Sequence, residues 1–95
     1  RHRECQVRMV DGLIERGFKM LVDKDHRLPE LLTVLLPDDI DDAAVRNRLL
    51  EDYHIEISAG LGPFAGKLWR IGLMGETARI ENVDRLLESL DEILN

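Results

Sequence analysis

The spacing of apolar residues predicts an amphipathic helix over residues 79–94, the clearest element of the chain. Its apolar positions recur every three or four residues, as they do on one face of an α-helix. They are Val83, Leu86, Leu87, Leu90, Ile93 and Leu94. Thr77 stands where a capping residue is expected.

Two further helices are predicted on weaker patterns. The first covers residues 3–16, with Gly17 as a left-handed cap after which Phe18 folds back on the last turn. Its apolar positions are Met9, Val10, Leu13 and Ile14. The second covers residues 43–53, with Asp41 or Asp42 as its N-cap. Val45, Leu49 and Tyr53 mark its apolar face, with Leu50 beside it.

Shorter apolar runs predict four strands, at 19–23, 31–36, 55–58 and 68–74. The run LLTVLL at 31–36 is short and ends at Pro37, as a buried strand does. Residues 23–27 form a polar connection, and Gly75 ends the last strand. Helix, two strands, helix, two strands, helix is the resulting order. It predicts an α+β fold: a small, mainly antiparallel sheet of three to four strands, with helices packed on one face.

Composition narrows the class of protein. Ninety-five residues form at most one domain, and a net charge of −6 argues against a nucleic-acid surface. The sequence contains no apolar run long enough to span a membrane. The single cysteine, Cys5, excludes an intrachain disulfide and suits a reducing compartment, so we expect a cytoplasmic protein. The chain begins without methionine inside a predicted helix, which indicates a piece of a longer protein.

Five of the seven glycines lie in the stretch 60–75, GLGPFAGKLWRIGLMG. Gly60, Gly62 and Ala65 fit a dinucleotide fingerprint in spacing, but that motif needs a helix after it, and here a strand follows. A P-loop fails as well, because its spacing is one residue short and Leu68 replaces the magnesium-binding Ser or Thr. Neither phosphate-binding motif is present.

Other candidate sites have structural explanations. In DDIDD at 38–42, a calcium-loop numbering puts Leu50 where the bidentate Glu is required, so a solvated helix cap is favoured. His2, His26 and His54 are scattered without metal-ligand spacing. Cys5 has no base partner. Trp69 is most simply a packing residue, and Lys67 is most simply solvated.

Arg70 stands out because it interrupts an otherwise apolar strand. One interpretation places it on the solvent face of an edge strand. The other gives it a ligand, since a guanidinium matches the two oxygens of a carboxylate and an unpaired buried charge is costly. The glycine-rich loop before the strand would let such a ligand approach the backbone. Spacing alone leaves both interpretations open.

The segments LPELLTVLLPDDID and RNRLLEDYHIEISAGLGPFAGKLWRIGLMGETARIENVDRLLESLDEIL carry a family likeness. They closely resemble the C-terminal small domain of class V, fold type I, pyridoxal-phosphate-dependent aminotransferases. The nearest branch is that of the alanine–glyoxylate and serine–pyruvate aminotransferases. The likeness is strong over residues 28–94, and its most specific part is IEI-x-x-GLGP-x-x-GK-x-x-RIG-x-x-G, at 55–75.

The resemblance implies a homodimeric transaminase in which residues 1–95 form the small domain, next to a large domain absent from this chain. It implies that Arg70 binds the α-carboxylate of an amino-acid or 2-oxo-acid substrate. It also places Gly60, Leu61 and Gly62 near the active-site entrance. No catalytic residue and no metal ligand is expected here.

The cofactor, pyridoxal phosphate, would be bound by the large domain, since none of Lys19, Lys24 and Lys67 sits in the family's lysine motif. We therefore expect the chain alone to be inactive, and an excised domain to expose an apolar patch that favours self-association. The alternative is a free-standing α+β module that binds a ligand or a protein without catalysis.

Overall fold

The computed structural model describes residues 2–21, 31–72 and 79–94. The predicted polar connection at 23–27, His26, Lys24, Gly75 and Thr77 lie outside these ranges. So do the last residues of the strands predicted at 19–23 and 68–74.

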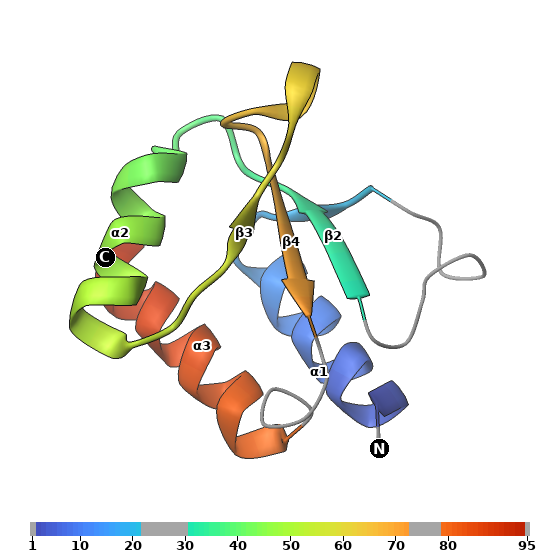
Figure 1. Cartoon of the computed structure of the whole chain (residues 1–95). Coiled ribbons are helices and arrows are strands. Elements are labelled where there is room, and N and C mark those ends of the chain that lie inside the picture. The colour runs from blue at the N-terminus through green and yellow to red at the C-terminus, as the bar shows by residue number, and fades with distance from the viewer. Residues whose placement is uncertain (1, 22–30, 73–78, 95) are drawn as a thin grey trace.

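The fold is the predicted α+β arrangement. The helices are α1 (His2–Glu15), α2 (Asp42–Tyr53) and α3 (Ile80–Leu94). The strands are β1 (Lys19–Met20), β2 (Leu31–Leu35), β3 (Ser58–Ala59) and β4 (Leu68–Gly72). They form one sheet in the order β1-β2-β4-β3, with every neighbouring pair antiparallel. The helices lie together on one side of it (Figure 1).

One face of the sheet supplies the core. Leu32 and Val34 of β2 and Trp69 and Ile71 of β4 are buried, whereas the residues between them are not. The side-chain period of two therefore sends one set toward the helices and leaves the other on an open face. From the helices the core receives Leu13, Leu49, Val83 and Leu90, among others. Trp69 and Phe18 stack at its centre, with ring centroids 5.4 Å apart.

Local signals set the helix ends. Gly17 adopts φ +92°, and the amide of Phe18 donates to the carbonyl of Leu13, so the predicted left-handed cap is confirmed. Of the two candidate N-caps for α2, Asp41 is the one that accepts from the Ala44 amide, at 3.1 Å. His54 ends α2 in a left-handed conformation with φ 59°.

Three details differ from the sequence prediction. The strand predicted at 55–58 is shifted, because only Ser58 and Ala59 pair with β4, although Ile57 still turns into the core. Ile14, expected in the apolar stripe of α1, is half exposed, as α3 covers only one side of that helix. β4 is a central strand and not an edge strand.

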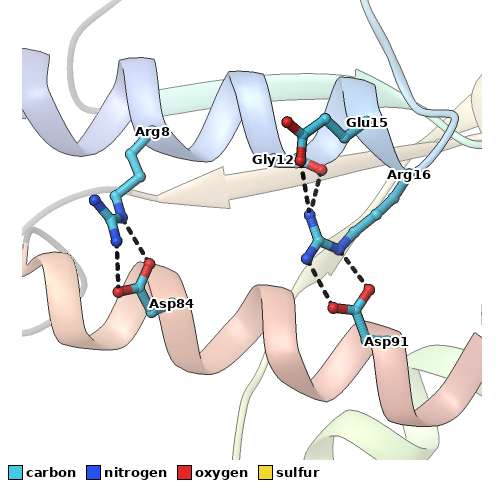
Figure 2. A network of polar contacts seen from close by, with 6 residues as sticks. All are labelled: Arg8, Gly12, Glu15, Arg16, Asp84 and Asp91. Atoms are coloured by element: carbon cyan, nitrogen blue, oxygen red, sulfur yellow. Dashed lines mark hydrogen bonds and ion pairs between the residues drawn. The ribbon is translucent and has the colours of Figure 1, made fainter.

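Helices α1 and α3 run side by side in the same direction, and two bidentate ion pairs join them (Figure 2). Arg8 donates to both carboxylate oxygens of Asp84, at 2.6 and 2.9 Å, and Arg16 to those of Asp91, at 2.7 and 2.8 Å. Gly12 lies between the two pairs. A Cβ atom at position 12 would stand only 2.4 Å from Leu87 Cδ1, so the glycine permits the close approach.

Candidate functional site

The candidate site lies on the open face of the sheet, opposite the helices. The strand register places three polar residues in one row across it. Thr33 of β2 pairs with Arg70 of β4, and Ser58 of β3 pairs with the same Arg70 from the other side. Arg70 and Ser58 are exposed and Thr33 is partly buried. Arg70 therefore stands in the middle of the sheet with a hydroxyl residue on each side.

Arg70 reaches this face because its neighbours occupy the other one. Trp69 and Ile71 turn into the core, so strand alternation directs Arg70 outward. Of the two interpretations of Arg70, the one with the solvent face of an edge strand is right about its exposure but wrong about its strand, which is hydrogen-bonded on both sides. A central position gives Arg70 ordered neighbours on two strands, which an edge strand would not.

Within residues 2–21, 31–72 and 79–94, the guanidinium of Arg70 has a single hydrogen-bond acceptor. Its Nε donates to the carbonyl of Ala59 at 3.3 Å, which draws the side chain toward β3. Arg8, Arg16 and Arg46 each make a bidentate pair with an aspartate. Among the described residues no carboxylate pairs with Arg70. A planar fork left open on an ordered strand is suited to an external carboxylate.

The glycine loop forms one border of the site. The Gly60 amide donates to the Leu68 carbonyl at 2.9 Å, and a Cβ at position 60 would lie 2.5 Å from the Phe64 carbonyl oxygen. The loop thus folds back over Leu68, two residues from Arg70 on the same face. Of the predicted loop residues, Gly60 lies against Leu68, two residues along β4 from Arg70, while Leu61 and Gly62 are at the exposed part of the loop. Leu61 is 72% exposed.

At the opposite border of the site, the described residues leave space. Gly72 follows Arg70 on the same face and pairs with Leu31. A Cβ added at Gly72 would meet no atom within 4 Å, and its φ is not positive. Nothing in the described structure requires glycine here, and a glycine inside a strand often marks a point of close approach. No described residue therefore covers Gly72 on this side of Arg70.

A polar network on the buried side was missed by sequence reasoning. Trp69 Nε1 donates to Asp42 Oδ1 at 2.6 Å, and Arg46 donates to both oxygens of the same carboxylate. The bonds from Arg46, and to a smaller extent that from Trp69, hold the pKa of Asp42 below its ordinary value. The spacing of Asp42 and Arg46 could have indicated their pairing, because residues four apart meet on a helix. Trp69 is the packing residue that was predicted, with its N–H satisfied.

None of the other candidate sites from the sequence analysis forms a site among the described residues. Cys5 is buried in the core, where a free thiol behaves as a small apolar group. No group of three potential metal ligands occurs among the described residues. Nor does any helix in the described ranges have the length and apolar character needed to cross a membrane. A separate cavity of about 380 Å³ is lined by Ile57, Ile71, Leu86, His54, Glu56 and Arg85, among others, and does not include Arg70.

Comparisons with known proteins find aminotransferases that resemble this chain. No protein-family model matches the chain. The chain is 41% identical over 95 residues to the alanine–glyoxylate aminotransferase of Drosophila melanogaster, which covers 99% of this chain and 24% of the relative. It is 38% identical over 94 residues to the (S)-ureidoglycine–glyoxylate transaminase of Bacillus subtilis, covering 99% of this chain and 23% of the relative.

Solved structures show the same relation. The alanine–glyoxylate aminotransferase of Nostoc sp. matches with a TM-score of 0.91 and 42% identity, over 99% of this chain and 25% of that one. The ureidoglycine–glyoxylate aminotransferase of B. subtilis matches with a TM-score of 0.88 and 38% identity, over 98% of this chain and 24% of that one. The chain spans about a quarter of the length of these relatives. Sequence and fold together confirm the likeness to the C-terminal small domain of class V aminotransferases.

The described residues do not build a site for pyridoxal phosphate, the cofactor that this family implies. Such a site needs a lysine held against the cofactor. Lys19 and Lys67 are both exposed, and neither pairs with a described carboxylate. Lys67 is solvated, as predicted.

Proposed function

We propose that the chain is the C-terminal small domain of a pyridoxal-phosphate-dependent transaminase, of the alanine–glyoxylate or serine–pyruvate type. In this proposal Arg70 binds the α-carboxylate that the amino donor and the 2-oxo acceptor share. The observation that carries the proposal is the Arg70 guanidinium, which pairs with no described carboxylate and lies on the face of the sheet opposite the described helices. The similarity to glyoxylate aminotransferases over 99% of the chain supports it.

In this proposal the small domain binds the substrate, and the cofactor-dependent chemistry takes place outside it. Arg70 orients the substrate through its carboxylate, and the amino-group transfer takes place on a cofactor bound outside these residues. The large domain and a second subunit are the partners in this proposal. The isolated chain is then a recognition element without catalysis.

Replacing Arg70 in the complete enzyme tests the role of this residue. Arg70→Ala removes charge-assisted hydrogen bonds and should raise KM about 10- to 100-fold. The KM values of amino donor and oxo acceptor should rise together, because both carry the same carboxylate. Arg70→Lys keeps the charge but loses the planar guanidinium, so its KM values should lie between those of the parent and those of Arg70→Ala. Arg48→Ala is a matched control, since Arg48 pairs with Asp52 on the exposed surface of α2.

Unchanged KM values for both substrates in Arg70→Ala would refute this role. A rise for only one substrate would assign Arg70 to a side-chain contact instead. The domain assignment has its own test in the reading frame upstream of Arg1. A continuous frame containing the family's lysine motif supports it, whereas a start codon just before Arg1 favours the free-standing module. A cofactor absorbance band in the purified 95-residue chain, reversible on adding an amino acid, would contradict the claim that it is inactive alone.

A further inference from the structure

The row across the open face contains two hydroxyl groups whose roles the fold leaves unexplained. Ser58 and Thr33 stand directly opposite Arg70 in antiparallel pairs, where Cβ atoms are about 4.5–5.5 Å apart. Neither hydroxyl makes a hydrogen bond with another described residue. By contrast, the hydroxyl of Ser89 is buried and satisfied by the Arg85 carbonyl at 2.7 Å. Stability therefore does not account for the hydroxyls of the row.

We infer that Ser58 and Thr33 are positioning residues that bind the substrate carboxylate together with Arg70. This inference rests on the proposed function of Arg70. A carboxylate accepts hydrogen bonds at two oxygens and has about four lone-pair sites, so one guanidinium leaves it unsatisfied. A hydroxyl on each side of the arginine supplies the further donors, and strand pairing fixes their places in the sheet.

Ser58 makes the larger contribution of the two. The bond from Arg70 Nε to the Ala59 carbonyl directs the guanidinium over β3, toward Ser58 and away from Thr33. Ser58 is also the more exposed of the pair. A carboxylate held by the fork thus lies nearer to the Ser58 hydroxyl.

The surroundings of the row leave room for a small acid. The glycine loop closes one side by folding over Leu68, whereas no described atom lies within 4 Å of a Cβ at Gly72 on the other. In this inference a small 2-oxo acid or amino acid has its carboxylate on the row and the rest of the molecule toward Gly72.

Substitutions in the complete enzyme test the inference. Ser58→Ala should raise KM for amino donor and oxo acceptor about five- to tenfold, the cost of one hydrogen bond, with kcat unchanged. Thr33→Val, which keeps the shape of the side chain, should raise both values by a smaller factor. Ser58→Thr and Thr33→Ser retain a hydroxyl and should restore most of the affinity. Because Ser58 is exposed, the thermal unfolding of Ser58→Ala should match that of the parent.

The results separate this inference from the proposed function. If Ser58→Ala and Thr33→Val leave both KM values unchanged while Arg70→Ala raises them, the hydroxyls play no part and the role of Arg70 stands. If Arg70→Ala also has no effect, the proposed function itself fails. A change in kcat alone, or in affinity for only one substrate, would also overturn the inference.

Discussion

Replacing Gly12 by alanine should destabilise the domain, although alanine is the better helix former. The new methyl carbon would lie 2.4 Å from Leu87 Cδ1 and 2.8 Å from Cδ2. Leu87 is buried, and the ion pairs Arg8–Asp84 and Arg16–Asp91 hold the helices at their present spacing on both sides of the contact. The strain must therefore be relieved by moving Leu87 or by separating α1 from α3.

Two opposing terms set the magnitude. Overpacking a core costs about 1–3 kcal/mol. Replacing glycine by alanine inside a helix returns about 1 kcal/mol. We therefore expect Gly12→Ala to lower the free energy of unfolding by about 0–2 kcal/mol. The decrease should lie in the upper part of this range if the ion pairs keep the helices from separating.

Denaturant unfolding followed by the fluorescence of Trp69 measures this effect, since Trp69 is the only tryptophan and is fully buried. Gly72→Ala is the control, because an added Cβ there meets no described atom within 4 Å, so this substitution should not lower the free energy of unfolding. In a background that carries Leu87→Ala, Gly12→Ala should cost less than in the parent, with a coupling of about 0.5–3 kcal/mol between the two substitutions. A Gly12→Ala variant more stable than the parent, or strictly additive effects in the double variant, would refute the close-contact argument.

Two further predictions concern the aspartates. Asp42→Asn weakens the ion pair with Arg46 and should lower the free energy of unfolding by about 1–3 kcal/mol. It also alters the hydrogen bond from Trp69, so the tryptophan emission should shift. An unchanged emission spectrum would contradict this hydrogen bond. The pKa values of Asp42, Asp84 and Asp91 are all lowered, through bonds from Arg46, Arg8 and Arg16 respectively. Their contribution is fully present above the unfolded pKa of about 3.9 and is lost as pH falls through the lower folded values. The urea concentration at the unfolding midpoint should therefore decrease as the pH is lowered below about 4. An equal decrease between pH 7 and pH 5 would mean that groups other than these aspartates are responsible.

Local patterns predicted most of the fold. The period of α3, the glycine after α1 and the acidic cap of α2 each depend on residues a few positions apart, which sequence alone displays. The third strand was predicted to begin at residue 55, whereas β3 begins at Ser58. Ile55 and Ile57 alternate like strand residues but do not pair with β4. Pairing depends on the partner strand, which no local pattern contains.

The sequence singled out Arg70 as a candidate site residue, but not the residues that lie next to it in the sheet. Arg70 stood out as a charge in an apolar strand, yet its central place between Thr33 and Ser58 follows from a strand order in which β4 separates β2 from β3. Similarly, the pair Arg16–Asp91 joins residues 75 positions apart. Neither long-range relation leaves a trace in spacing, and Gly12 gave no sign of its contact with Leu87.

The contact between α1 and α3 also affects how the chain folds during synthesis. α1 leaves the ribosome before α3, because the helix that covers Gly12 begins only at Ile80. At about 5–20 residues per second, that delay lasts roughly 3–13 s, whereas a helix forms in microseconds or less. The side of α1 that packs against α3 must therefore wait for seconds in the nascent chain before α3 can cover it.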